Sequence, residues 1–370
     1  MLGFLVGNRA PSLKSASEVH TLRRPARETL ASNSVALVSN ALEPPPDEGI
    51  RKCAHELALV LPKKGVSIYS IPEDAPGVAR KFLVSRPMIR KLRADDVRAV
   101  IYLPTQSATL GSLLRSAVLR SLVGAKVVLL ALQPRDLPPM STMLARLVRP
   151  DLVLTPSPSM FREAERRGLE AAYVQLGVDL DRFRPAGPGR KHELRRKYGL
   201  PSEQPIVLHV GHARRLRGLE WLVGLGADIV PLVVIGKSLG FDPEVVRTLR
   251  HSGVVVFDEY LPQIHEIYQL TDAYAFPVRN EQSAIGSPLS VLEAMACDVP
   301  LVTTTFGALP AMIREGSGVF FADDEARFRA CLVEAVRLPQ DEVRTRDQVL
   351  PYSWTATADR VLTAAKDLFD

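Results

Sequence analysis

The chain has 370 residues, of which 46% are hydrophobic and 24% are charged. This composition is typical of a folded globular protein and excludes a disordered or fibrous chain. The length exceeds what one ordinary hydrophobic core organises, so we expect two domains. The formal net charge of +6 suits anionic substrates or loose contact with an anionic membrane surface, and an arginine-rich solvated surface explains it equally well; it does not indicate nucleic-acid binding.

Three scattered cysteines (Cys53, Cys297 and Cys331) have no zinc or redox spacing, which predicts buried thiols in a reducing cytoplasm. No apolar run approaches the length of a membrane-spanning helix. The first residues, MLGFLVG, lack the basic stretch and cleavage site of a signal peptide. The segment 1–33 is rich in Ser, Arg and Ala without a clear period, and we expect it to be poorly ordered.

After residue 34, short apolar runs alternate with segments of helical spacing. Strands are predicted over residues 35–39, 66–70, 97–103, 126–132 and 151–155, and helices over residues 50–61, 109–123 and 141–148. Short apolar strands separated by helices favour a parallel sheet that is covered on both faces. We assign residues 34–185 to this first domain.

A second series of the same kind starts at residue 206. Its predicted strands begin at residues 206, 232, 253, 272 and 299, and its helices cover residues 219–225, 243–252, 264–270 and 289–295. Residues 186–204 are rich in Pro, Gly and charge, as in a linker with one short helix. We assign residues 205–352 to the second domain and residues 353–370 to a closing helix that packs back on the first. Two doubly wound, Rossmann-like α/β domains would place ligands in the cleft between them.

The segment RNEQSAIGSPLSVLEAMACDVPLV, residues 279–302, is the most informative of the chain. It predicts a turn at Gly286, Ser287 and Pro288, followed by a helix. A helix that begins in this way leaves N–H groups near Leu289 and Ser290 unpaired. Together with the turn at Gly286 and the helix dipole, they form an anion site for the donor. Glu293, one turn further, could accept two hydrogen bonds from a sugar diol. A phosphate and a diol side by side indicate a nucleotide sugar.

Several segments resemble the retaining family 4 group of GT-B glycosyltransferases, the glycosyl transferases group 1. They are EPPPDEGIRKCAHELALVL, TPSPSMFREAERRG with LGVDLDRFRP, VLHVGHARRLRGLEWLV, PLSVLEAMACDVPLV with FGALPAMI, and YSWTATADRVL. The resemblance spans roughly residues 34–366. It implies two Rossmann-like domains with an interdomain cleft, and transfer of a sugar from a nucleotide-diphosphate sugar to a glycan, lipid-linked or small-molecule acceptor with retention of configuration.

The resemblance also implies roles for single residues. Glu293 matches the family's second glutamate, which binds the donor ribose; the alternative is a glutamate that only complements the helix dipole. Arg217 stands where the family has the lysine that neutralises the donor diphosphate, so electrostatic catalysis would act there; the alternative is a solvated arginine beside Arg214 and Arg215. His212 would donate to phosphate when protonated, or is a plain turn residue.

Other positions depart from the family pattern. The family's first glutamate, which contacts the transferred sugar, is Ile285 here. Glu281 lies four residues earlier and would reach the donor only if the loop is rearranged. Asp298 replaces a glycine, Ala311 a glutamate, and Gln133 a histidine. Together they predict an atypical sugar pocket.

Two further expectations concern the chemistry of the site. The family's front-face mechanism needs no protein nucleophile, and no Asp-x-Asp motif is present, so we expect neither a metal nor a cofactor. Gly49 opens the helix 50–61 on the acceptor side, where it either permits close approach of a phosphate or sugar or simply starts the helix.

The apolar stripe on helix 109–123 faces the core or docks on a membrane, and we favour the core. The stripe consists of Leu110, Leu113, Leu114, Ala117, Val118 and Leu122, with Arg115 and Arg120 on another face.

The alternative function is a non-catalytic GT-B protein that binds a nucleotide or a glycan as a partner subunit. A nucleotide-sugar epimerase of the same fold is a third, weaker hypothesis. We expect no nucleic-acid partner and a cytoplasmic protein, with peripheral contact at the inner face of the membrane left open. The sequence leaves the donor, the acceptor and the oligomeric state undetermined.

Overall fold

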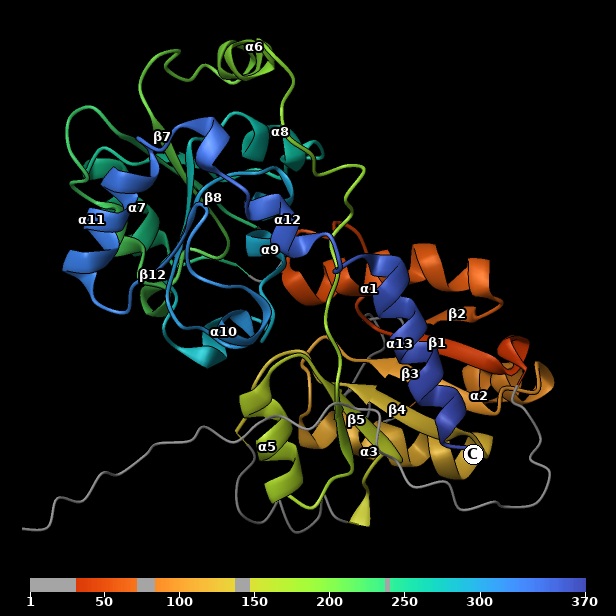
Figure 1. Ribbon diagram of the computed structural model, residues 1–370. Coiled ribbons are helices and arrows are strands. Elements are labelled where there is room, and N and C mark those ends of the chain that lie inside the picture. Colours follow the sequence, from red (N-terminus) through yellow and green to blue (C-terminus); the bar gives the residue numbers. More distant parts are fainter. Residues whose placement is uncertain (1–30, 72–83, 137–146, 237–239) are drawn as a thin grey trace, which may run out of the picture.

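The computed structural model describes residues 31–71, 84–136, 147–236 and 240–370. Two parallel six-stranded sheets lie next to each other, each flanked by helices (Figure 1). This is the predicted α/β fold class. The segment predicted to be poorly ordered, 1–33, lies almost wholly outside the described residues, and the helix predicted at 141–148 lies largely outside them.

The N-terminal sheet has the strand order β2-β1-β3-β4-β5-β6. Every residue of β1 and β3 is buried, as expected for strands covered on both faces. Five of its strands were predicted; the sixth, β6, is three residues long and was not. The strands are β1 (Val35–Ser39), β2 (Ser67–Ser70), β3 (Ala99–Leu103), β4 (Lys126–Leu130), β5 (Leu152–Thr155) and β6 (Ala171–Tyr173), and the helices include α1 (Gly49–Val60), α2 (Arg86–Ala94), α3 (Leu110–Val118) and α5 (Pro158–Arg166).

The C-terminal sheet has the strand order β12-β11-β10-β7-β8-β9. Its strands are β7 (Ile206–Val210), β8 (Val230–Val234), β9 (Val255–Phe257), β10 (Ala273–Phe276), β11 (Leu301–Thr303) and β12 (Val319–Phe321). Its helices include α7 (Pro243–His251), α8 (Ile264–Gln269), α9 (Leu289–Ala296), α10 (Leu309–Met312), α11 (Glu325–Ala335) and α12 (Thr345–Val349). The prediction of a helix at 219–225 is wrong, since only a 3-10 turn forms there, at Leu219–Leu222. The turn is flanked by Gly218 and Gly224, whose positive φ angles of 71° and 72° end the helical conformation on either side.

The segment 186–204 is part of the C-terminal domain and not a free linker. Its helix α6 (Arg190–Lys197) packs on α8, and Leu194 and Leu200 enter the C-terminal core. The buried Arg195 donates to the Leu270 carbonyl at 3.1 Å and pairs with Asp272. The predicted short helix is α6. It is fixed on the C-terminal domain because its charges are paired with groups of that domain.

The chain crosses between the domains twice at one place. Val178 donates its N–H to the carbonyl of Tyr352 at 3.0 Å, just before α13 (Trp354–Asp367). From there α13 returns to the N-terminal domain and lies along α1 and the sheet (Figure 1). Its residues Trp354, Val361 and Ala365 are buried in the N-terminal core.

Helix α3 buries a different face from the one predicted. Leu113 is fully buried, but Arg115, expected on the polar face, is also buried and donates to the Tyr102 hydroxyl at 3.1 Å. Leu122, predicted in the apolar stripe, is 45% exposed at the π-helical turn that follows. The shift arises because the buried tyrosine of β3 offers a partner to the guanidinium. Within the described residues, no helix has both the length and the apolar character needed to cross a membrane.

Candidate functional site

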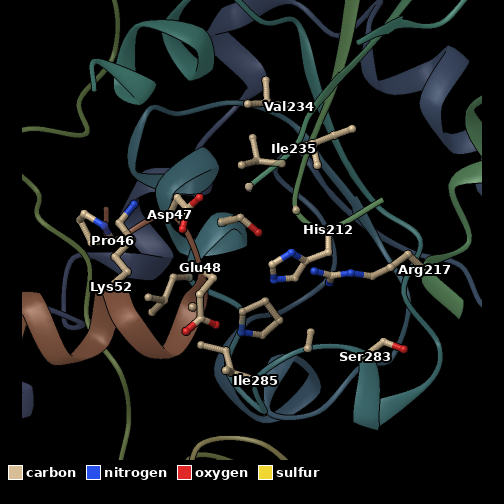
Figure 2. A pocket seen from close by; sticks show the side chains of 18 of the residues that line it. Pro46, Asp47, Glu48, Lys52, His212, Arg217, Val234, Ile235, Ser283 and Ile285 are labelled. Carbon is tan, nitrogen blue, oxygen red and sulfur yellow. The ribbon is translucent and has the colours of Figure 1, made fainter. Parts of the chain in front are cut away.

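A cavity of about 940 Å³ lies between the two domains, at the carboxyl ends of the strands (Figure 2). The N-terminal domain contributes the loop before α1, the first turns of α1 and the segment after β4. The C-terminal domain contributes the ends of β7 and β8, the turn at Arg217 and the start of α9. The cavity is where doubly wound folds bind their ligands.

The start of α9 forms one wall of the cavity. Leu289 and Ser290 line it, and within the described part of the chain their N–H groups have no hydrogen-bond partner. Pro288 precedes them at the N-cap and offers no side-chain cap. The unpaired donors and the positive end of the helix therefore face the cavity, as an anion site requires.

Gly286 does not contribute to this anion site, contrary to prediction. Its N–H donates to the carbonyl of Leu132 at 2.7 Å, and its own carbonyl accepts from Ala308 at 2.8 Å. A Cβ at this position would lie 2.9 Å from the Sδ of Met160. The glycine is needed because the N-terminal domain packs closely against the loop there.

Arg217 is a buried cation at the edge of the cavity. Its side chain is 6% exposed, and its Nε has no hydrogen-bond partner. Within the described residues no carboxylate pairs with it. Burial lowers its pKa to about 10, so the guanidinium stays charged at neutral pH. Figure 2 shows Arg217 beside His212. A buried charge without a counter-ion is costly, and a bound anion would offset that cost.

His212 lies in the cavity, but its charge state differs from the predicted one. Burial, together with Arg217 and Arg214, lowers its pKa to about 4. Without an anion beside it the imidazole is neutral at pH 7. His212 is half-buried and lines the cavity.

His209 was missed by sequence reasoning because it lies within the apolar strand β7. It is fully buried, and its Nδ1 lies 2.9 Å from the carbonyl of Ala275, which makes Nδ1 the protonated nitrogen. Its Nε2 has no hydrogen-bond partner. A Cβ on Gly211 would lie 3.0 Å from this Nε2 and 2.9 Å from an Nη of Arg217. The glycine thus leaves room for both side chains.

Glu293 lines the cavity and is 4% exposed. Its carboxylate forms an ion pair with Lys52 of α1, across the cleft. The Lys52 ammonium also lies 4.9 Å from the centre of the Phe183 ring. Sequence reasoning missed Lys52, since nothing in α1 alone shows that it meets a carboxylate of the other domain. Burial, and next the Glu293 carboxylate, raises the pKa of the Tyr268 hydroxyl.

Glu281 is not brought to the cavity. It is exposed, and its carboxylate accepts a hydrogen bond from the Ser159 hydroxyl at 3.0 Å, beside a second cavity of about 350 Å³. The loop is held in this position because Gln133 donates to the carbonyl of Gln282 at 2.5 Å. The rearrangement that Glu281 would need is therefore resisted by contacts between the domains.

Gly49 is the first residue of α1 and lines the cavity. A Cβ at this position would lie 3.0 Å from Ile285, so the close approach that the glycine permits is made by a side chain of the other domain. The N-terminus of α1 is capped by Glu48, whose carboxylate accepts from the N–H groups of Ile50 and Arg51. The described residues contain no group of three His, Cys, Asp or Glu side chains arranged to hold a metal ion.

The fold agrees with comparisons to known proteins. The sequence model of the family glycosyl transferases group 1 matches residues 204–337. The chain is 31% identical over 227 residues to the D-inositol 3-phosphate glycosyltransferase of Actinosynnema mirum, a match that covers 53% of this chain and 52% of the relative. The chain thus spans about half the length of the curated relatives it matches.

Solved structures match over a larger part of the chain. A glycosyltransferase from Rickettsia africae superimposes on 91% of this chain and 98% of its own, with a TM-score of 0.70 and 14% identity. Anabaena Alr3699/HepE in complex with UDP-glucose covers 90% and 99%, with a TM-score of 0.68 and 13% identity. The chain therefore has the GT-B glycosyltransferase fold, as the resemblance implied. Within the C-terminal domain, residues 204–337 are similar to the glycosyl transferases group 1.

Proposed function

We propose that this protein is a glycosyltransferase that moves a sugar from a nucleotide-diphosphate sugar to an acceptor with retention of configuration. The observation that carries the proposal is the buried, unpaired guanidinium of Arg217 in the same cavity as the unpaired N–H groups of α9. A diphosphate supplies the two negative charges that these groups lack.

The donor would lie along the cavity in a defined order. The diphosphate lies between Arg217 and the start of α9, and the ribose lies one helical turn further. There the Glu293 carboxylate accepts hydrogen bonds from the ribose hydroxyls, which replace its ion pair with Lys52. As the glycosidic bond breaks, negative charge grows on the departing diphosphate. Arg217 and the N–H groups of Leu289 and Ser290 stabilise that charge, so the reaction needs neither a metal nor a cofactor.

The names of similar proteins guide the choice of substrates. The relatives are named D-inositol 3-phosphate glycosyltransferases, and one structural neighbour is described in complex with UDP-glucose. A phosphorylated polyol is therefore the first acceptor to test, followed by glycans and lipid-linked acceptors at a membrane surface. UDP-glucose, UDP-N-acetylglucosamine, GDP-mannose and ADP-glucose form the donor panel.

The test is release of nucleoside diphosphate from each donor, with and without acceptor, followed by NMR of the anomeric configuration of the product. We expect acceptor-dependent release and retention for one donor. Inversion of configuration would contradict the retaining mechanism, and the absence of binding to every nucleotide would contradict the function.

A non-catalytic binding protein is the second candidate. Two observations favour it: the loop that would present a carboxylate to the sugar presents Ile285 instead, and Glu281 accepts a hydrogen bond from Ser159. Nucleoside-diphosphate binding without turnover, for every donor and acceptor of the panel, would support this candidate.

A further inference from the structure

The loop before α1 enters the cavity from the N-terminal domain. Pro46, Asp47, Glu48 and Gly49 all line the cavity. The loop touches the C-terminal domain so closely that a Cβ on Gly236 would lie 2.4 Å from the Asp47 carbonyl oxygen. Figure 2 shows Asp47 and Glu48 side by side on this loop, with Ile285 below Glu48. Two carboxylates are thus brought into the cavity that also contains Arg217 and the start of α9.

The two carboxylates have different neighbours. Asp47 lies near His212, since its negative charge acts to raise the pKa of that histidine. Glu48 lies near Arg135, since its negative charge acts to raise the pKa of that arginine. A Cβ on the adjoining Gly49 would lie 3.0 Å from the Ile285 side chain. Glu48 therefore faces the part of the cavity between the N-terminal domain and the start of α9.

Glu48 makes the N-terminus of α1 unsuitable for a phosphate. Its Oε1 accepts from the Arg51 N–H at 2.9 Å and its Oε2 from the Ile50 N–H at 3.3 Å. The donors that a phosphate would use at this helix are already satisfied, and the carboxylate repels an anion. The diphosphate is confined to the opposite wall, at Arg217 and α9.

The part of a donor that reaches Glu48 must then be polar and uncharged. An ionised carboxylate has about four acceptor positions, of which the helix cap uses two. The nearby wall, formed by Ile285, Pro288 and Leu289, has no polar side-chain atom. A carboxylate with spare acceptor positions beside an apolar wall suits a sugar ring, whose hydroxyls donate while its C–H face packs.

We propose that the Glu48 carboxylate binds hydroxyls of the transferred sugar and selects donors that present them. This inference rests on the proposed function, and it assigns the sugar contact to the N-terminal domain.

The test compares nucleoside diphosphates with their sugar conjugates in Glu48→Gln. Glutamine keeps an acceptor oxygen for the helix cap and loses the charge. The probes are UDP, GDP and ADP together with UDP-glucose, UDP-N-acetylglucosamine, GDP-mannose and ADP-glucose, measured by titration calorimetry. We expect Glu48→Gln to weaken the preferred sugar conjugate about tenfold while the affinity for the free diphosphate stays equal or rises. Asp47→Asn makes the same charge change at the adjacent residue. It should change the affinities for the diphosphate and for its sugar conjugate by the same factor.

Three outcomes overturn the inference and can be told apart. An equal loss for the diphosphate and its conjugate, with a lower melting temperature, would show that Glu48 only caps α1. Unchanged affinity for the conjugate would show that the sugar does not reach Glu48. If the wild-type protein binds none of the nucleotides, the proposed function fails first and the inference fails with it.

Discussion

Arg217 shows what a single residue contributes to this site. The guanidinium is buried and charged, yet within the described residues no carboxylate neutralises it. Replacing it by methionine keeps most of the volume and removes the charge. We expect Arg217→Met to weaken nucleoside-diphosphate binding about 10- to 100-fold, since a hydrogen bond to a charged group contributes roughly 1.5–3 kcal/mol. Titration calorimetry measures this loss.

The matched control is Arg247→Met, because Arg247 lies on α7 of the same domain, does not line the cavity, and has a side chain that is 61% exposed. This variant should bind the diphosphate nearly as the wild type does. Binding of the corresponding nucleoside, which has no phosphate, should be unchanged in both variants. If Arg217→Met weakens the nucleoside as much as the diphosphate, Arg217 shapes the cavity and does not bind the phosphates.

The buried His209 and the half-buried His212 predict how stability depends on pH. Burial lowers the pKa of His209 to about 3 and that of His212 to about 4, whereas an unfolded histidine titrates near 6.5. Below pH 6.5 both histidines are protonated in the unfolded chain but stay neutral in the folded protein, so unfolding takes up protons. The contribution to stability is complete above pH 6.5 and is lost as the pH falls towards 4.

His212→Asn removes one of these two titrating side chains. We expect the free energy of unfolding to fall less steeply between pH 6.5 and 4.5 in this variant, by at most about 1.4 kcal/mol per pH unit. Urea unfolding at pH 7, 6 and 5 measures the slope. The exposed His251, changed to asparagine, should leave the slope as it is. Equal slopes in wild type and His212→Asn would disprove the assignment.

At the scale of residues, the sequence was informative where one short segment carries a site. The start of α9 and Glu293 lie within a few residues of each other, so helix geometry alone predicts that they face one cavity. Lys52 and Glu48 lie on the other domain, and no local pattern shows which side chains meet across a cleft. Gly286 was misinterpreted for the same reason, because its hydrogen-bond partner is Leu132 of the other domain.

At the scale of elements, continuous apolar runs such as β1 and β3 were predicted well because both faces of each sheet are buried. The failures have local causes. Glycines with positive φ reduce the segment 219–225 to a 3-10 turn. Ion pairs to Asp272 and Glu266 fix α6 on the C-terminal domain, although its composition is that of a linker.

The double crossing before α13 depends on Gly177. A Cβ at this position would lie 2.4 Å from the backbone carbon of Ser353 and 2.5 Å from the backbone nitrogen of Trp354. Backbone atoms cannot move aside as a flexible side chain can. We therefore expect Gly177→Ala to lower the free energy of unfolding by about 1–3 kcal/mol, measured by chemical denaturation.

Gly187→Ala is the matched control, because a Cβ there has no atom within 4 Å and its φ is not in the positive region. It should leave stability unchanged within about 0.5 kcal/mol or raise it slightly. A Gly177→Ala variant as stable as Gly187→Ala would show that the two crossing segments can separate without cost.

At the scale of the whole molecule, the two domains meet around the cavity through contacts of several kinds. The Gly286 N–H binds the Leu132 carbonyl, Ser159 binds Glu281, and Lys52 pairs with Glu293. The first two lie outside the cavity, and only the third involves a cavity residue to which we assign a ligand. Under the proposed function, nucleotide binding and domain contact therefore compete for the Glu293 carboxylate.

This competition gives a prediction for Lys52→Met. The pair is largely buried, with side-chain exposures of 17% for Lys52 and 5% for Glu293, so removing the ammonium leaves a carboxylate without its partner. We expect a loss of about 2 kcal/mol in the free energy of unfolding, which lowers the melting temperature by about 2–3 °C for a chain of this length. Lys63→Met, at an exposed lysine shortly after α1, should have almost no effect.

The same variant separates competition from direct contact. If the ribose takes Glu293 from Lys52, the wild-type protein must break the ion pair to bind, whereas Lys52→Met has no pair to break. A saturating nucleoside diphosphate should then raise the melting temperature of Lys52→Met more than that of the wild type or of Lys63→Met, because the stabilisation follows the binding constant. A smaller rise in Lys52→Met would show instead that the ammonium itself binds the nucleotide, and that the ion pair with Glu293 gives way to a contact between Lys52 and the diphosphate.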